Sequence, residues 1–343
     1  MIGYYAHHLG SGHVHRAGVI ASAVASPLVG FSTLAPPAGW PGRWIHLPDD
    51  SGDFTPSPSD DVTAGGTLHW VPLGHAGLRE RMGLIGAELA RGDVGVVVSD
   101  VSVEVAVLAR LHGIPVVVMA QPGDRTDRPH QLCYDLAERL LAPWPAEVPS
   151  TWPRRWLDKT VHVGALSRFD DRTPEKPPGA RRVLVLWGSG GLDVGPDDLR
   201  AAAAATPGWR WHVVGQQPPG TGEPPNLSWH GWVDDVWSRL AGADVVVTHG
   251  GQNALAEVAA ARRPAVVLPQ SRPHGEQHAS GDMLRHLGVG TVVPTWPEPD
   301  AWPGLLERAR DGGGEWERWS SGKGAQQAAA VLDALAAPPG RRA

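Results

Sequence analysis

Short apolar runs alternate with longer amphipathic stretches along the whole chain. The runs are continuous and rich in valine, as strands buried on both faces of a parallel sheet are. In the first half, the predicted strands are 2–6, 29–32, 94–99 and 115–119, and the predicted helices are 14–25, 78–91, 103–111 and 128–140. This alternation is typical of βαβ units, so we expect a parallel sheet with helices on its faces.

The same alternation begins again in the second half. Residues 167–180 contain prolines and a glycine that stop regular structure, so we expect a linker there. Residues 48–66 are rich in Pro, Gly, Ser and Asp and are expected to form a loop, where an acceptor lid would lie. The later predicted strands are 182–187, 209–214, 227–229, 244–247, 265–268 and 290–293, and the helices include 234–240 and 326–336.

These patterns predict two doubly wound α/β domains in the 343-residue chain. We expect Rossmann-like domains at 1–165 and 181–343, a linker at 166–180, and a last helix that returns to the first domain. Ligands of such sheets bind beyond the carboxyl ends of the strands. The cleft between the two domains is therefore the expected site.

Residues 248–277 combine a glycine turn with well-spaced polar side chains. The strand at 244–247 leads into Gly250 and Gly251, and Glu257 follows on the next helix. Glycines ahead of a helix let backbone N–H groups and the helix dipole meet an anion. A carboxylate one turn further on is placed to bind the diol of a ribose, as acidic residues do in other nucleotide sites. The segment therefore indicates a nucleotide-sugar site.

This segment resembles the donor-binding signature of inverting glycosyltransferases with the GT-B fold, the MurG-like and UDP-glycosyltransferase-like superfamily. The resemblance covers most of the chain, and it is weak outside the motifs. It implies a GT-B architecture, with two Rossmann-like domains facing a central cleft. It also implies that His249, Gly250, Gly251, Gln252 and Asn253 face the donor phosphates, that Glu257 binds the ribose, and that Glu276 and Gln277 contact the donor sugar.

Two further stretches match the donor side of these enzymes. The turn of Gly188, Ser189, Gly190 and Gly191 follows the first strand of the second half, and the resemblance places it near the donor phosphates. An ordinary strand-to-helix turn is the alternative. Trp232 and Val233 are expected to line the base pocket, although Trp232 is also compatible with a place in the core.

Two nearby polar residues have simpler interpretations. We expect Asp234 to cap the helix that follows it. Arg272 is placed to meet the donor phosphate or the acceptor, but a solvent-facing arginine is at least as good an interpretation.

His13 is the candidate catalytic base. It lies in a glycine-rich turn after the first strand, which lacks the third glycine of a dinucleotide fingerprint. In the resembled enzymes a histidine at this turn faces the acceptor, and a neutral imidazole suits the removal of a hydroxyl proton. The alternative is a histidine that satisfies hydrogen bonds at a helix end.

Asp100 is the candidate partner of His13, because a carboxylate fixes the tautomer of a catalytic imidazole. In the resembled enzymes an aspartate about this far along the chain orients the histidine, and both residues end parallel strands at one edge of the sheet. Asp100 is equally placed to cap the helix at 103–111. Glu104 is a weaker substitute.

Composition excludes several classes of protein. The net charge of -6 and the lack of a long basic run argue against a nucleic-acid partner. A single cysteine, Cys133, excludes an internal disulfide framework and fits a reducing cytoplasm. No signal segment and no apolar run of about 18 residues is present. We therefore expect a cytoplasmic protein; contact with a membrane surface is left open, and for residues 152–156 we favour a packing role.

We expect no metal and no cofactor. His7, His8, His13 and His15 lack a known ligand spacing, and the acidic residues between 49 and 61 are typical of a solvated loop. No pair of aspartates with the DxD spacing occurs at the expected donor site. In enzymes of this kind, glycine-rich turns and helix dipoles take over the charge role of a metal.

The expected function is that of a metal-independent hexosyltransferase that works with inversion. The donor is a nucleotide sugar, a UDP-sugar first and a dTDP-sugar second, and the acceptor is a small molecule or a lipid-linked sugar. The oligomeric state is left open. The nearest alternative is a nucleotide-sugar hydrolase or 2-epimerase on the same fold, and a more distant one is a non-catalytic partner subunit that binds nucleotide sugar.

Overall fold

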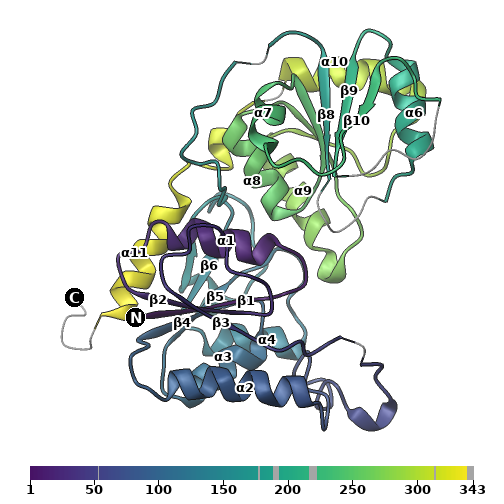
Figure 1. Ribbon diagram of the computed structural model, residues 1–343. Coiled ribbons are helices and arrows are strands. Elements are labelled where there is room, and N and C mark those ends of the chain that lie inside the picture. Colours follow the sequence, from purple (N-terminus) through teal and green to yellow (C-terminus); the bar gives the residue numbers. More distant parts are fainter. Residues whose placement is uncertain (53, 177, 188–192, 216–221, 313, 338–343) are drawn as a thin grey trace. The chain divides into compact units, whose positions relative to one another are not determined.

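A computed structural model describes the chain except for residues 53, 177, 188–192, 216–221, 313 and 338–343 (Figure 1). The chain divides into two compact units. The first unit comprises Met1–Pro143, Ser150–Val163 and Lys323–Ala343, and the second comprises Trp144–Pro149 and Gly164–Gly322. The chain therefore passes more than once between the units, and its last helix belongs to the first.

The first unit is a seven-stranded parallel sheet in the order β3-β2-β1-β4-β5-β6-β7. Its strands are β1 Ile2–Ala6, β2 Leu28–Ser32, β3 Arg43–His46, β4 Val96–Asp100, β5 Val116–Met119, β6 Arg139–Ala142 and β7 Thr160–His162. Its helices are α1 Gly12–Ala21, α2 Ala76–Leu89, α3 Val103–Leu111, α4 Arg128–Leu136, α5 Arg154–Leu157 and α11 Gly324–Ala336. In Figure 1, α1 and α11 cover one face of this sheet, and α2, α3 and α4 cover the other.

The second unit is a six-stranded parallel sheet in the order β10-β9-β8-β11-β12-β13. Its strands are β8 Arg182–Leu186, β9 Arg210–Val214, β10 Leu227–Trp229, β11 Val245–His249, β12 Ala265–Leu268 and β13 Thr291–Val292. Its helices are α6 Pro196–Ala205, α7 Val236–Ala241, α8 Gln252–Ala261, α9 Glu276–Leu287 and α10 Trp302–Gly312. Valine-rich strands and four buried tryptophans (Trp187, Trp209, Trp211 and Trp302) make up much of its core.

Both units confirm the predicted fold class of doubly wound parallel sheets. In each sheet the strand order reverses beside the first strand of the unit, and such switch points bind ligands in this class of fold. The strands end together there: Ala6 pairs with Asp100, and Thr248 pairs with Leu186. Side chains that follow these strands are therefore brought close to one another.

Two predicted helices were too long, and the one predicted at 14–25 ends at Ala21. The helix expected at 128–140 ends at Leu136, and residues 139–142 form β6 instead. Ala137 adopts an extended backbone conformation, and the Glu138 amide donates to the Val116 carbonyl, which continues the pairing with β5. The predicted pattern also lacked β3 and β7, which are short and only partly buried.

In the part of the chain that the structure describes, no helix combines the length and the apolar character needed to cross a bilayer.

Candidate catalytic and donor-binding residues

His13 and Asp100 contact each other in the first unit. His13 lies in the first turn of α1, and Asp100 is the last residue of β4. The Nδ1 atom of His13 lies 2.8 Å from Oδ1 of Asp100. Asp100 is fully buried, whereas the His13 side chain keeps 21% of its surface exposed. Arg16 also lies 3.1 Å from Nδ1 of His13. The tautomer with a proton on Nδ1 lets His13 donate to the Asp100 carboxylate, and Nε2 is then the nitrogen that can accept a proton.

Asp100 is the centre of a buried polar cluster. Its Oδ2 accepts hydrogen bonds from Arg16 Nε at 2.9 Å and from the Tyr4 hydroxyl at 3.0 Å. Burial alone would raise the pKa of Asp100, but the charge of Arg16 and the contact with His13 hold that pKa well below its usual value. Asp100 therefore stays ionised, so it can orient His13 and stabilise a positive charge on the imidazole.

Asp100 does not cap the helix at 103–111, which was the alternative to its pairing with His13. Ser102 is the N-cap of α3, and its hydroxyl accepts from the Val105 amide. Glu104 is also engaged elsewhere, because its carboxylate accepts from the amides of His69 and Trp70.

The sequence did not lead us to predict that Arg16 and Tyr4 belong to the site. Arg16 follows His13 by three residues, which places both on one face of α1. Tyr4 lies on β1, which pairs with β4. The presence of an arginine on the apolar face of a predicted helix could have indicated a buried ion pair.

Two more histidines adjoin this cluster. His7 stacks on His8 with ring centroids 4.8 Å apart, and it meets His13 edge to face at 5.9 Å. Burial lowers the pKa of His7 to about 3, with the charges of His13 and His8 adding to the effect. His8 lies 3.6 Å from an Asp50 carboxylate that is itself paired with Arg81. His7, His8 and His13 are thus held by carboxylates and by one another.

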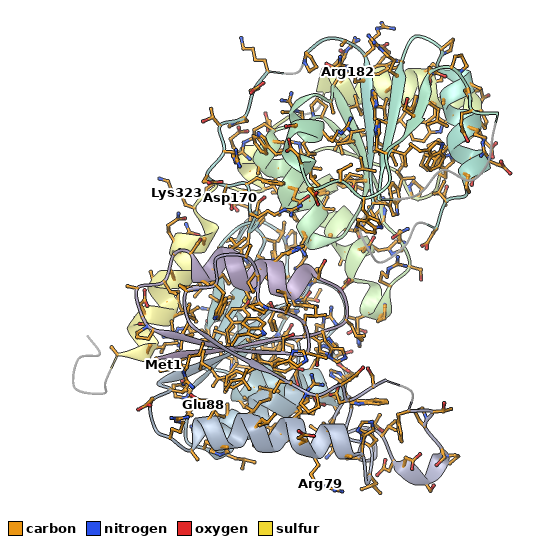
Figure 2. The ribbon with its side chains drawn as sticks, viewed as in Figure 1. Met1, Arg79, Glu88, Asp170, Arg182 and Lys323 are labelled. Atoms are coloured by element: carbon orange, nitrogen blue, oxygen red, sulfur yellow. The ribbon has the colours of Figure 1, made fainter. Side chains whose placement is uncertain are left out.

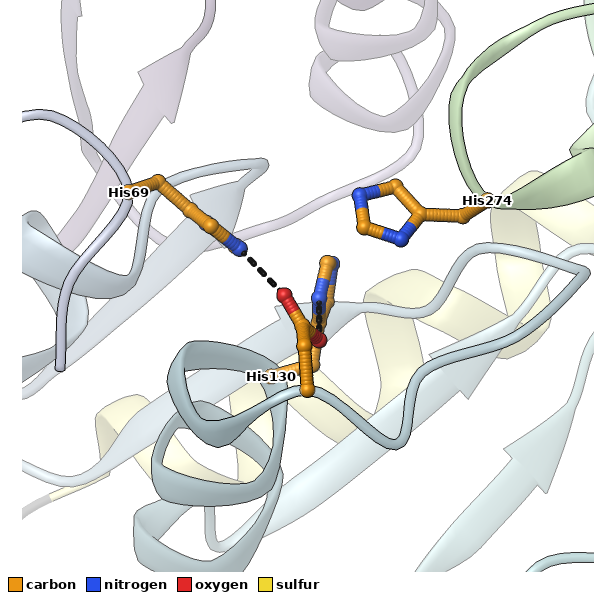
Figure 3. Close-up of side chains that lie close together, drawn as sticks. His69, His130 and His274 are labelled. Carbon is orange, nitrogen blue, oxygen red and sulfur yellow. Dashed lines mark hydrogen bonds and ion pairs between the residues drawn. The ribbon is translucent and has the colours of Figure 1, made fainter. Parts of the chain in front are cut away.

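A second histidine–carboxylate group lies in the same unit. His69 Nε2 is 3.0 Å from Oδ2 of Asp127, and His130 Nδ1 contacts the other oxygen of the same carboxylate (Figure 3). Arg125 donates to His130 Nε2 at 3.2 Å, which leaves the proton of a neutral His130 on Nδ1, facing Asp127. Burial, and next the charge of Arg125, lower the pKa of His130 to about 4. Hydrogen bonds therefore account for all three contacts.

In the second unit, the turn after β11 presents backbone N–H groups. Gly251 is the N-cap of α8 and has no side chain to cap the helix, and Gln252 and Asn253 form its first turn. The Gly251 amide donates to His249 Nδ1 at 3.0 Å. Burial, and next the charge of Arg272, lower the pKa of His249 to about 4, so this histidine is neutral near pH 7. The arrangement suits an anion, because the helix N-terminus carries partial positive charge.

Gln277 joins this turn to the loop after β12. Its side chain is buried, and Oε1 accepts from the amides of Gly250 at 3.1 Å and Gln270 at 3.0 Å. Gln277 therefore fixes the shape of the turn, a role that the sequence did not show. Glu276 is the first residue of α9 and is half-buried.

Glu257 lies on α8 one turn beyond Asn253, and its side chain is 14% exposed. Burial raises the pKa of Glu257, while the charge of Arg168 opposes that shift. Arg168 Nε donates to Oε1 of Glu257 at 2.9 Å. The structure thus pairs the predicted ribose ligand with an arginine from the predicted linker.

Of the remaining residues that the sequence assigned to the donor site, some are exposed or half-buried and some lie outside the described residues. Trp232 is 66% exposed, so it is not a core residue, and Val233 is half-buried. The helix cap expected at Asp234 is Asp235 instead, whose carboxylate accepts from the Ser238 amide. The turn of Gly188, Ser189, Gly190 and Gly191 lies outside the described residues. Arg272 bonds to the side chain of Gln270 and lies 3.6 Å from Asp193.

Comparison with known proteins agrees with the fold. The family model of the glycosyltransferase family 28 C-terminal domain matches residues 214–295. An uncharacterized glycosyltransferase of Methanopyrus kandleri is 26% identical over 265 residues, which are 69% of this chain and 74% of that protein. A solved structure described as the glycotransferase of kitacinnamycin matches with a TM-score of 0.69 at 20% identity, covering 97% of this chain and 98% of that one.

A second relative is more similar in sequence. The UDP-N-acetylglucosamine–N-acetylmuramyl-(pentapeptide) pyrophosphoryl-undecaprenol N-acetylglucosamine transferase of Rubrobacter xylanophilus is 30% identical over 272 residues, covering 67% of this chain and 75% of that protein. Other transferases of this name are matched over about half of their length. The chain belongs to the GT-B-fold glycosyltransferases and carries a C-terminal domain of glycosyltransferase family 28.

We predict that Asp100→Asn destabilises the protein by about 3–5 kcal/mol, because it leaves the buried guanidinium of Arg16 without a counter-charge. Urea unfolding measures the free energy, and adding Arg16→Met should restore much of it. The control is Asp158→Asn, which breaks an exposed ion pair with Arg154 and should cost about 1 kcal/mol or less. If Asp100→Asn and Asp158→Asn destabilised the protein equally, Asp100 would not be the centre of a buried charge cluster.

We predict that Gly250→Ala also destabilises the protein, by about 1–3 kcal/mol. A methyl group at Gly250 would lie 2.6 Å from the Gln277 carbonyl oxygen, so the turn must shift. Thermal unfolding gives the measurement. Gly83→Ala on α2 is the control, because nothing lies within 4 Å of its added carbon and alanine favours a helix. A Gly250→Ala protein as stable as the control would show that the turn has room.

Proposed function

We propose that the protein transfers a sugar from a nucleotide-sugar donor to an acceptor hydroxyl with inversion at the anomeric carbon. The observation that carries the proposal is the His13–Asp100 pair, in which a buried, ionised carboxylate orients a partly exposed imidazole. Membership of the GT-B glycosyltransferases supports the reaction class.

In the proposed reaction, Nε2 of His13 accepts the proton of the acceptor hydroxyl as its oxygen attacks the anomeric carbon. The bond between that carbon and the donor phosphate oxygen breaks on the opposite side, and the nucleoside diphosphate leaves with the bonding electron pair. Asp100 stabilises the imidazolium that forms, as the carboxylate of a catalytic triad does. Attack opposite the leaving group inverts the configuration.

The donor would be held by the second unit. The amides of Gly250 and Gly251 already donate to Gln277 and His249, so we assign the diphosphate to the N-terminus of α8, which begins at Gln252. Glu257 suits the ribose diol. Glu276 and Gln277 are proposed to orient the sugar, with the base near Trp232 and Val233. We propose a UDP-sugar first, as in the name of the Rubrobacter relative, and a dTDP-sugar second.

The family resemblance also supports the proposals on the metal, the acceptor and the site of action. The N–H groups and helix dipole at the donor turn would offset the leaving charge without a metal. The acceptor is proposed to be a small molecule or a lipid-linked sugar, and the site of action the cytoplasm. A hydrolase or 2-epimerase would use the same donor site, so the assays below include donor without acceptor.

We predict that UDP or dTDP raises the melting temperature of the protein and that Glu257→Ala removes most of this shift. A ligand at a hundredfold excess over its dissociation constant stabilises by about 2.7 kcal/mol, and losing the ribose contact removes much of that. Glu298→Ala, an exposed carboxylate in the same unit, is the control and should keep the shift. An unchanged shift in Glu257→Ala would remove the ribose assignment.

We predict that His13→Ala lowers kcat by about 10²- to 10⁴-fold while the nucleotide-induced rise in melting temperature stays. Turnover of UDP-sugars is followed as UDP release with panels of phenolic, sugar and polyprenyl-linked acceptors. His46→Ala, an exposed histidine of β3, is the control and should leave kcat unchanged. Near-normal turnover of His13→Ala would refute the base assignment, and UDP release that needs no acceptor would favour the hydrolase.

A further inference from the structure

A cavity of about 300 Å³ lies in the second unit, at the amino ends of β8 and β9 and beside α7. Arg182 and Arg210 are the first residues of these strands and are paired with each other in the sheet. His212 follows Arg210 by two residues, so its side chain lies on the same face of β9. The strand register thus places three basic side chains together on one face.

The polar lining of this cavity is almost entirely basic. Arg182, Arg210, His212 and Arg239 line it together with the hydroxyl-bearing Ser238, and no carboxylate is among its described lining residues. Figure 2 labels Arg182 at the start of β8. Arg210 and Ser238 are exposed, so the cavity is open to solvent.

The guanidinium groups of Arg182, Arg210 and Arg239 have no carboxylate partner within 4.0 Å among the residues that the structure describes. Neighbouring arginines of the same unit do: Arg181 pairs with Glu307 at 3.1 Å, and Arg200 pairs with Glu223 at 2.8 Å. Like charges on directly paired strand positions destabilise a sheet. We therefore expect the repulsion between Arg182 and Arg210 to lower stability unless an anion binds there, whereas the charge of Arg239 also acts on Asp235.

The pKa of His212 depends on the charges of these three arginines. Its Nδ1 lies 3.0 Å from Nε2 of His230, and the two rings stack with centroids 5.3 Å apart. Burial lowers the pKa of His212, followed by the charges of His230 and of the three arginines. An anion that offset those arginines would raise the pKa of His212, which makes this imidazole a local probe.

We propose that this cavity binds a phosphate-type anion, separate from the donor site. Guanidinium groups offer paired N–H donors that match phosphate oxygens. The Ser238 hydroxyl is not counted among these donors, because it donates to the Asp235 carboxylate. The donor turn follows the carboxyl end of β11, whereas Arg182 and Arg210 begin their strands, and β8 is parallel to β11. The two sites lie at opposite ends of one sheet. A free phosphate compound and the phosphate of a lipid headgroup share this chemistry.

The experiment follows the imidazole signal of His212 by NMR as inorganic phosphate is added, with the signal assigned by His212→Asn. In the wild-type protein, phosphate should raise the pKa of His212. In Arg182→Gln/Arg210→Gln, that pKa should already be higher without phosphate, and phosphate should leave it unchanged. The matched control removes two exposed arginines elsewhere, Arg79 on α2 (labelled in Figure 2) and Arg308 on α10, and should respond as the wild type does.

A second arm separates the two sources of phosphate. Wild type and variants are sedimented with vesicles of phosphatidylglycerol or of phosphatidylcholine. Binding to the anionic vesicles alone, lost in Arg182→Gln/Arg210→Gln and displaced by phosphate, would identify a lipid headgroup. A phosphate response without vesicle binding would identify a free ligand.

The site is overturned if neither phosphate nor anionic vesicles change the His212 signal. It is also overturned if the response persists in Arg182→Gln/Arg210→Gln, because the anion would then bind elsewhere. The result does not depend on the proposed transfer reaction, since His212 reports only on its own end of the sheet. A second readout is thermal unfolding: without phosphate, the double variant should melt above the wild type, because two repelling charges are gone.

Discussion

The ionised carboxylate of Asp100 is the constraint on which the candidate catalytic site depends. It is fully buried at the end of β4, where a charge is tolerated only with partners. Arg16 from α1, Tyr4 from β1 and His13 supply those partners, so one charge ties the neighbouring strands β1 and β4 to α1, the helix that follows β1. The orientation of the imidazole therefore follows from the same interactions that hold the switch point of the sheet together.

The two proposed anion sites of the second unit differ in the groups that would hold the anion. At the carboxyl end of β11, neutral N–H groups and a helix dipole would receive the diphosphate, and His249 stays neutral there because it is buried. At the amino ends of β8 and β9, whole positive charges converge instead. A helix N-terminus offers partial charges, whereas guanidinium groups offer full charges and paired donors.

The fold was predictable because valine-rich runs mark buried parallel strands, and the strand at 265–268 and the helix at 103–111 have the same bounds in the structure. Residues 139–142 were misassigned because their burial depends on pairing with β5, which local periodicity does not show. The contact of His13 with Asp100 was one of two equal alternatives in the sequence, the other being a helix cap, and the family resemblance implied the orienting role. The contact of Arg168 with Glu257 was not predicted. It joins residues that are 89 positions apart, and Arg168 lies in a segment without regular structure.

The pair of Arg168 and Glu257 bears on how a donor would bind. Burial would favour a protonated Glu257, and a protonated carboxyl keeps only part of the acceptor capacity that would serve both hydroxyls of a ribose diol. Arg168 opposes that effect and contacts only Oε1, so Oε2 is not used by this ion pair. Ribose hydroxyls are neutral donors, so they can share the carboxylate with the arginine rather than replace it. In the proposed function, Arg168 is therefore a positioning residue that keeps the ribose ligand charged and in place.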